Sequence, residues 1–118
     1  MAEYFGLLHA ADHEYPVVEG ELQRHAPGCY SAHSGIKRWN RRSESLLGTA
    51  ERWATAATVW IGLPSPQADL ERGWRSVLFS QFHDILAGTA IQPAYDDVRD
   101  LHGESMSIAS RALNHATQ

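Results

Sequence analysis

Apolar residues recur at intervals of three and four positions between residues 34 and 61. This interval is the spacing of one face of an α-helix. The repeat consists of Ile36, Trp39, Ser43, Leu46, Leu47, Ala50, Trp53, Ala54, Ala57, Trp60 and Ile61. Ser34 stands in the position of an N-cap, and Gly62 follows the last apolar residue. The pattern therefore predicts a helix over residues 34–61.

A second helical repeat covers residues 66–87. Ser65 precedes it as an N-cap, Pro66 takes the first helical position, and Gly88 lies where a helix commonly ends. The apolar stripe of this segment consists of Leu70, Trp74, Val77, Leu78, Gln81, Phe82 and Ile85. We therefore predict one continuous helix from Pro66 to the residue before Gly88.

A third repeat covers residues 91–116, with Pro93 in its first turn. Its stripe consists of Tyr95, Val98, Leu101, Ser105, Ile108 and Leu113. The connections between the three long helices are short, so neighbouring helices should run antiparallel. The predicted fold class is all-α, an antiparallel three-helix bundle.

Residues 1–33 differ from the rest of the chain. A short helix is predicted near residues 3–11, and a long ordered connecting loop follows, interrupted by Pro16, Gly20, Pro27 and Gly28. A loop of this length is uncommon in a compact domain unless it is functional or lies against another surface. We treat residues 1–118 as a single domain. Its abrupt beginning and uncapped end predict that it is a piece of a longer protein.

A polar pair, His83 and Asp84, lies near the end of the predicted helix over residues 66–87. With 3.6 residues per turn, His83 falls about 180° from the centre of the apolar stripe, and Asp84 lies on its flank. Phe79 and Leu86 share the outward side with His83. Imidazole beside carboxylate is suited to holding a metal or a sugar, and the apolar neighbours predict a docking surface whose other half lies outside this chain.

Composition excludes several classes of protein. The 118 residues suit one domain, which buries roughly two thirds of the surface of its unfolded chain. A formal net charge of −4 argues against nucleic acid as a partner, and short apolar runs argue against a membrane span. Cys29 is the only cysteine, so an intrachain disulfide is excluded and a reducing, cytoplasmic setting is expected.

An ordered set of residues along the chain resembles a known family. The set is Val18, Glu19, Gly20, Glu21, Leu22, His25, Gly28, Tyr30, Ser31, Lys37, Arg38, Asn40, Arg41, Glu44, Leu47, Ala50, Glu51, Trp74, Gln81, His83, Asp84, Gly88 and Thr89. In order and spacing these residues resemble the central helical domain of glycoside hydrolase family 38 α-mannosidases. Residues 18–51 and 74–89 carry the resemblance, and the segment from residue 91 onward matches in pattern more than in identity.

The resemblance implies that the parent is a zinc-dependent retaining α-mannosidase, which hydrolyses terminal α-mannosides. His83 would be the one zinc ligand from the helical domain, and Asp84 would contact sugar hydroxyls. The other zinc ligands, including the nucleophilic aspartate, belong in that family to a preceding α/β barrel. No catalytic residue is therefore assigned to this chain. Its expected partners are the α-mannoside and the barrel and β-rich domains of the parent.

Two rival functions remain open. The chain is alternatively a non-catalytic interaction module, in which Phe79 and Leu86 bind a partner protein and His83 is dispensable. A helical His-Asp pair is also typical of the metal-dependent phosphohydrolases named after it. These need further ligands from other helices, for which His25 and either Asp96 or Asp100 are candidates. The outward direction of His83 argues against this second rival.

Several other conspicuous side chains have structural interpretations. Gln81 is expected to be a buried hydrogen-bonding residue. Core packing is predicted for Trp39, Trp53, Trp60 and Trp74. A solvated helix face, or a contact to the missing domain, is predicted for Lys37, Arg38, Arg41 and Arg42. No sugar contact is assigned to Tyr30 or Ser31, whose side chains are able to brace the loop.

Overall fold

The computed structural model describes residues 2–11, 13–22 and 26–118. In this part of the chain all regular secondary structure is helical. The helices are α1 (Ala2–Ala10), α2 (Ser34–Ile61), α3 (Gln67–Ser80), α4 (His83–Ala87) and α5 (Gln92–Thr117). The predicted all-α fold class is therefore confirmed.

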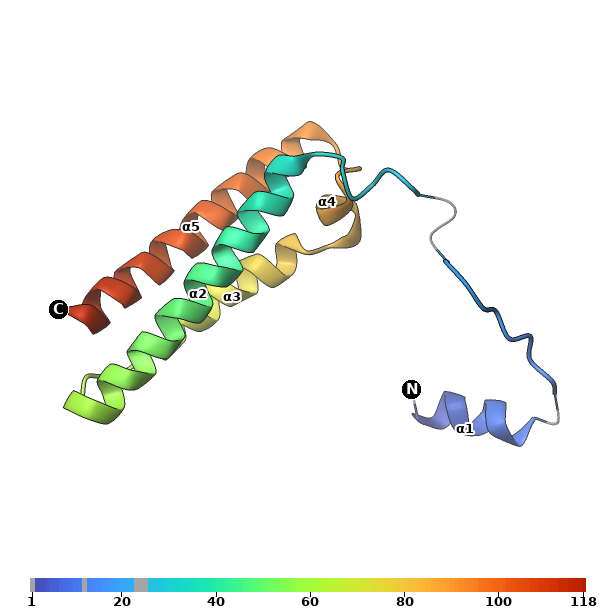
Figure 1. Ribbon diagram of the computed structural model, residues 1–118, viewed down its shortest axis with the longest axis horizontal. Coiled ribbons are helices and arrows are strands. Elements are labelled where there is room, and N and C mark those ends of the chain that lie inside the picture. The colour runs from blue at the N-terminus through green and yellow to red at the C-terminus, as the bar shows by residue number, and fades with distance from the viewer. Residues whose placement is uncertain (1, 12, 23–25) are drawn as a thin grey trace.

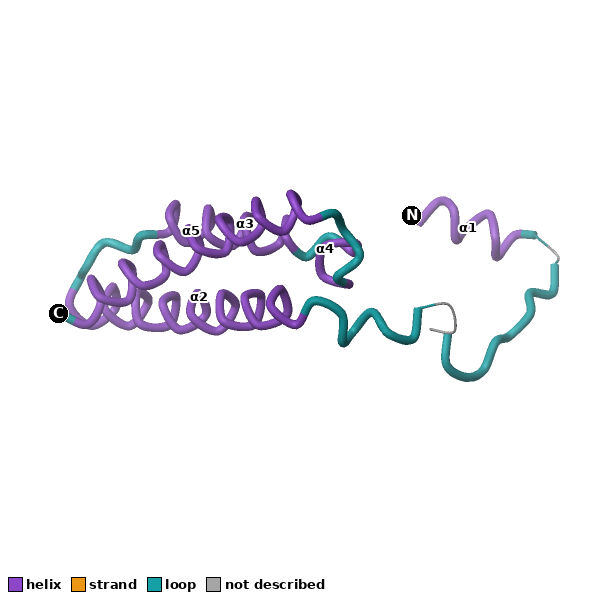
Figure 2. Tube along the Cα trace, turned by 90° about the horizontal axis from the view of Figure 1, so that it is seen from above, coloured by secondary structure: helices purple, strands orange, loops and turns teal. Residues whose placement is uncertain are grey.

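The three long helices α2, α3 and α5 form a bundle (Figure 1). α3 runs antiparallel to α2, and α5 returns antiparallel to α3, as the short connections predicted (Figure 2). Gly62 adopts the left-handed conformation that ends α2, with φ 71°. Because each helix has one apolar face, the bundle buries these faces against one another and leaves the polar faces in water.

The main core lies between the three long helices. Its buried residues are Leu47, Ala50, Ala54, Leu70, Val77, Ala109 and Ala112. The helices approach closely at Gly73, where an added Cβ would lie 3.0 Å from the Leu47 Cδ2 atom. The hydroxyl of Ser105, which is buried, donates to the Gly73 carbonyl at 3.1 Å. Small residues therefore set the distance between α3 and its neighbours.

A second apolar cluster closes the end of the bundle that carries α4. It joins Ile36 of α2, Ile85 of α4, and Tyr95 and Val98 of α5. Ile85 is the buried residue of α4. One apolar side chain thus anchors the short helix to the bundle, and the other side of α4 faces away from it.

The N-terminal segment lies outside the bundle. α1 contains no buried residue, and residues 13–22 are exposed and without regular structure. The radius of gyration is 20.0 Å, whereas a compact domain of this length would have a radius of about 13.5 Å. Figures 1 and 2 show that the difference comes from this segment, which extends away from α2.

The prediction of one helix over residues 66–87 was wrong. α3 ends at Ser80, and Phe82 has an extended backbone with ψ 139° before α4 begins at His83. The buried positions explain the break, because 70, 73, 77 and 80 follow helical spacing whereas the next buried residue is Ile85. In a continuous helix, a step of five residues would turn Ile85 away from the buried face. The break at residues 81 and 82 allows Ile85 to be buried.

The prediction that all four tryptophans pack in the core was also wrong. Trp39 and Trp74 are half-buried, but Trp53 is 47% exposed and Trp60 is 76% exposed. Alanines fill the corresponding contact face of α2, so the indole rings project beside it. Leu78 and Phe82 are also exposed, because Leu78 lies off the buried face of α3, and Phe82 follows the end of that helix.

Two predicted N-caps differ from the structure. Ser34 is already the first residue of α2, and His33 precedes it in the left-handed conformation with φ 47°. Pro66 takes the cap position of α3, which begins at Gln67, so Ser65 lies one residue too early. Both helices begin without a side-chain hydrogen bond from the cap residue.

Candidate functional site

His83 and Asp84 are the first two residues of α4 and point into solvent. The His83 side chain is 78% exposed and the Asp84 side chain is 56% exposed, with 3.6 Å between Nε2 and Oδ2. The Phe82 ring lies against the imidazole, with 4.2 Å between ring centroids. The predicted outward direction of His83 is therefore confirmed. Its cause is the break after α3 and not the far side of a continuous helix.

A tight C-terminal turn fixes the end of α4. Gly88 is left-handed with φ 88°, and its amide donates to the Ile85 carbonyl while the Thr89 amide donates to the Asp84 carbonyl at 3.0 Å. These two bonds form a Schellman motif. The predicted role of Gly88 as the residue that ends a helix is confirmed. The Thr89 hydroxyl also lies 3.3 Å from Asp84 Oδ1, so the motif restrains the carboxylate as well as the backbone.

A groove of about 490 Å³ lies beside His83, between α4, α2 and the loop before α2. We call it the polar groove because several polar side chains line it, although much of its surface is apolar. Tyr30, Asn40, Arg41 and Gln81 contribute to its lining together with His83. Gln81 Nε2 donates to Asn40 Oδ1 at 3.0 Å and to Glu44 Oε1 at 2.8 Å. The predicted hydrogen-bonding role of Gln81 is confirmed, and its side chain is half-buried at the break between α3 and α4.

An apolar groove of about 730 Å³ lies between α5 and the segment that joins α3 to α4. Phe79, Phe82 and Ile91 line it and are 74%, 54% and 73% exposed. Asp84 lines the same groove. The prediction that Phe79 is exposed is confirmed, whereas Leu86 is half-buried and lines the polar groove. The His-Asp pair thus has a groove with several polar side chains beside its histidine and a more apolar groove beside its aspartate.

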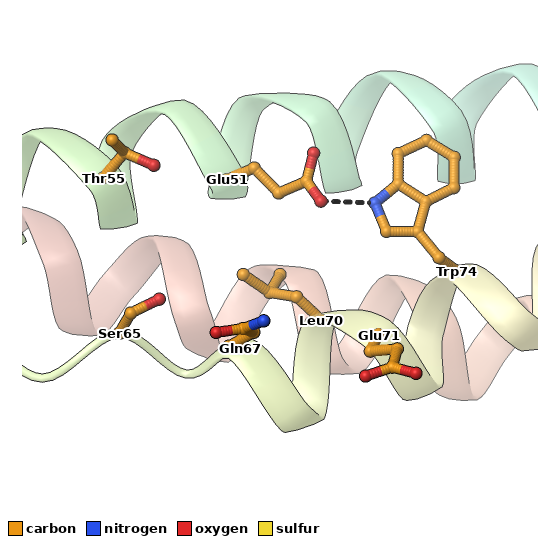
Figure 3. Close-up of a pocket in the computed structure, with 7 residues that line it drawn as sticks. All are labelled: Glu51, Thr55, Ser65, Gln67, Leu70, Glu71 and Trp74. Atoms are coloured by element: carbon orange, nitrogen blue, oxygen red, sulfur yellow. Dashed lines mark hydrogen bonds between the residues drawn. The ribbon is translucent and has the colours of Figure 1, made fainter.

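A third groove, of about 600 Å³, lies between the C-terminal half of α2 and the start of α3 (Figure 3). Here the Trp74 indole donates to Glu51 Oε1 at 2.7 Å, and Leu70 lies between the two helices. The Trp74 nitrogen is engaged with α2, so the bond ties α3 to α2. His83 and Asp84 do not line this groove.

Two of the further ligands considered for a phosphohydrolase site, Asp96 and Asp100, have another partner. Asp96 and Asp100 are exposed on α5 and pair with Arg99, whose nitrogens lie 3.9 and 3.3 Å from their carboxylates. His25 lies outside the described residues. Among the described residues, His, Cys, Asp and Glu side chains form no group of three or more that is able to hold a metal ion.

The side chain of Lys37 was assigned to a solvated face or to a contact with a missing domain, and the structure corrects the first alternative. Its ammonium donates to the carbonyls of Cys29, Ala32 and Ala87. Sequence reasoning missed this role because the acceptors are backbone atoms. Arg38, Arg41 and Arg42 are exposed, as expected of a solvated face.

Known proteins are similar in sequence to this chain over most of its length. Residues 25–118 match the model of the alpha mannosidase middle domain. The chain belongs to this family. The resemblance to the middle domain of family 38 α-mannosidases is thereby confirmed. The match begins at residue 25, so α1 and residues 13–22 lie outside the matched region.

Individual relatives agree with the family. The chain is 34% identical over 102 residues to alpha-mannosidase G of Dictyostelium discoideum, covering 82% of this chain and 9% of that protein. It is 33% identical over 94 residues to human alpha-mannosidase 2C1, covering 73% of this chain and 9% of that protein. A Saccharomyces cerevisiae alpha-mannosidase is 33% identical over an alignment of 87 residues, covering 70% of this chain and 8% of that protein. The chain thus spans about a tenth of the length of these relatives.

In the part of the chain that the structure describes, no helix combines the length and the apolar character that crossing a bilayer needs.

Proposed function

We propose that this chain is the helical middle domain of a zinc-dependent retaining α-mannosidase, and that it supplies His83 as a zinc ligand and Asp84 as a sugar contact. The other zinc ligands, the nucleophile and the acid/base would come from a barrel domain elsewhere in the parent chain. The observation that carries the proposal is the exposed His-Asp pair at the start of α4, in a chain of the α-mannosidase middle domain family.

The donor chemistry of the pair fits this role. A neutral imidazole is a common zinc ligand, and an exposed ring is accessible to an ion held mainly by another surface. When bound, zinc would hold sugar hydroxyls and help to orient the ring beside the nucleophile. Asp84 would accept hydrogen bonds from sugar hydroxyls, which are stronger with a charged acceptor than with a neutral one.

The surroundings of the pair support a site shared between two surfaces. The polar groove beside His83 offers amide, guanidinium and phenol groups, which suit a hydroxylated ligand. The apolar groove on the other side leaves Phe79 and Ile91 largely in water. Exposed apolar residues of this kind are typical of a docking face. We assign this groove to contact with the barrel domain, so that docking covers Phe79 and brings the two halves of the site together.

Exchanging His83 in the full-length parent tests the proposal. Removing an outer-shell partner of a metal ligand typically costs 10- to 100-fold, so we expect His83→Ala, which removes a ligand, to lower hydrolysis of an aryl α-mannoside by about 100-fold or more. Zinc content, measured by mass spectrometry, should fall with it. His115→Ala, at an exposed position of α5, is the matched control. Full activity with retained zinc in His83→Ala would remove His83 from the site.

The same assay separates this function from a non-catalytic interaction module. In the module, Phe79→Ser would abolish partner binding while His83→Ala would change nothing. Under the proposal, Asp84→Asn should keep the zinc and lower kcat/KM for the mannoside. Equal kcat/KM in Asp84→Asn and the unaltered parent would argue against the sugar contact.

A further inference from the structure

The two proposed site residues stand on a helix that is too short to hold its own position. α4 has five residues, and isolated helices are marginal in water below about 12 residues. Ile85 anchors it by burial, and the Tyr95 hydroxyl of α5 donates to the Asp84 carbonyl at 3.4 Å. The positions of His83 and Asp84 are therefore set by what holds the two ends of α4.

Lys37 of α2 holds the C-terminal end. Its ammonium donates to the Ala87 carbonyl at 3.2 Å, and to the carbonyls of Cys29 at 3.0 Å and of Ala32. An ammonium has three donors, so all three are used, and each meets a backbone carbonyl. A Cβ at Gly88 would lie 2.8 Å from the Ala32 oxygen, which shows how closely the loop lies against the end of α4. Lys37 thus ties this loop and α4 to α2 at one point.

Asn40 and Glu44 of the same helix hold the N-terminal end. Both accept hydrogen bonds from Gln81, the residue at which α3 gives way to α4. Arg41 lies 3.4 Å from the second carboxylate oxygen of Glu44. The Gln81 amide group therefore fixes the corner that precedes His83 by two residues.

The three α2 side chains form one stripe. Positions 37, 40 and 44 are three and four residues apart, so they lie on the same face of a helix. This face is polar, and it meets α4 and its preceding corner, whereas Ile36, Ser43 and Leu47 of α2 are buried in the bundle. The apolar stripe therefore builds the bundle, and the polar stripe engages the element that carries the site.

We propose that Lys37, Asn40 and Glu44 are positioning residues for His83 and Asp84, which clamp both ends of α4 to α2 and thereby fix where the imidazole and the carboxylate are presented. The role of Lys37 in the clamp is to hold backbone, and it touches neither a metal nor a sugar. The functional part of this inference rests on the proposed function, whereas the clamp itself is a property of this chain.

Hydrogen exchange tests the clamp directly. The amides of Leu86, Gly88 and Thr89 are bonded within α4 and its terminal turn, so their exchange reports the opening of this helix. Lys37→Met keeps an unbranched apolar stem and removes the donors. Because hydrogen bonds to charged groups are stronger than those between neutral groups, we expect these amides to exchange at least about tenfold faster. Amides of α2, α3 and α5 should keep their rates, and thermal unfolding should shift little.

Arg38→Met is the matched control, since Arg38 is the next residue of α2 and is exposed. Gln81→Met is a second variant, which releases the other end of α4 and should accelerate the Leu86 amide in the same way. Unchanged exchange of all three amides in Lys37→Met would overturn the clamp. Acceleration shared equally by the whole bundle would also overturn it, because it would show that Lys37 supports global stability alone. If either variant fails to fold within the 118-residue chain, the exchange of the same amides is compared in the full-length parent.

Zinc affinity tests whether the clamp affects the proposed site. In the full-length parent, Lys37→Met should weaken zinc binding by about tenfold, because part of the binding free energy is then used to order α4. Arg38→Met should leave zinc binding unchanged. If His83→Ala leaves zinc affinity unchanged, the proposed function fails and the exchange result still decides the clamp. If His83→Ala loses zinc but Lys37→Met binds it normally, the clamp has no role in presenting His83.

Discussion

His102 is a titratable side chain inside the bundle, with 1% of its surface exposed. Its Nδ1 atom lies 3.0 Å from the Ser43 hydroxyl, and its Nε2 atom has no hydrogen-bond partner within the described parts of the chain. Burial lowers the pKa of His102 from its ordinary value of 6.5, and the nearby Glu44 carboxylate opposes this shift only in part. The neutral ring is therefore the form that the fold accepts.

This burial predicts loss of stability in acid. Because the pKa of His102 is lower in the folded chain than in the unfolded chain, protons bind preferentially to the unfolded state, so stability declines as the pH falls below 6.5. We expect the urea midpoint to fall between about pH 7.5 and about pH 5.5, and His102→Gln, which does not titrate, to reduce this fall. An equal fall in both proteins would show that other groups cause the acid sensitivity.

At the level of single residues, the sequence was informative about His83 and less so about its neighbours. Its exposure was predicted from polarity opposite an apolar stripe, and the structure agrees although the helix is broken. The hydrogen bonds of Lys37 to three carbonyls could not be predicted, because every residue type has a backbone carbonyl and the sequence therefore does not mark the acceptors. The exposure of Trp53 and Trp60 was not predicted. Periodicity shows which side of α2 is apolar but not how much of that side is buried, and alanines make the contact with the bundle.

Among the elements, α4 depends most on one backbone conformation. Gly88 has φ 88°, and a Cβ there would meet the Ala32 oxygen at 2.8 Å. We expect Gly88→Ala to destabilise the chain by about 1 to 3 kcal/mol, through left-handed strain and the forced retreat of the loop. Chemical denaturation measures this cost.

Gly48→Ala is the control for that variant, because Gly48 lies in α2 with no heavy atom within 4 Å of an added Cβ. Alanine there should be stabilising by about 0.5 to 1 kcal/mol. If Gly88→Ala is as well tolerated as Gly48→Ala, the turn that ends α4 does not need a glycine.

The helices themselves were largely predictable. α2 and α5 fall within one or two residues of the segments expected from periodicity, because long amphipathic repeats and Gly62 mark them clearly. The break between α3 and α4 lacks a proline or glycine, so no local signal marks it. It follows from tertiary contacts, namely the bonds of Gln81 to α2 and the burial of Ile85.

For the whole molecule, the proposed function divides one site between two parts of a parent protein. Within the described residues, His83 has Asp84 beside it and no further potential ligands gathered into a group of three or more. A zinc site needs three or four protein ligands, so one imidazole should hold the ion weakly. The exposed apolar groove beside Asp84 indicates in addition where the other part would dock.

Zinc binding and aryl α-mannoside hydrolysis, measured side by side on this 118-residue chain and on the full-length parent, test the shared site most directly. We expect the parent to retain zinc through dialysis and to hydrolyse the mannoside. The 118-residue chain should show a helical circular dichroism spectrum, lose zinc on dialysis and show no turnover, even with added zinc. Turnover or tight zinc binding by the 118-residue chain alone would contradict the division of the site between His83 and Asp84 here and a barrel domain elsewhere.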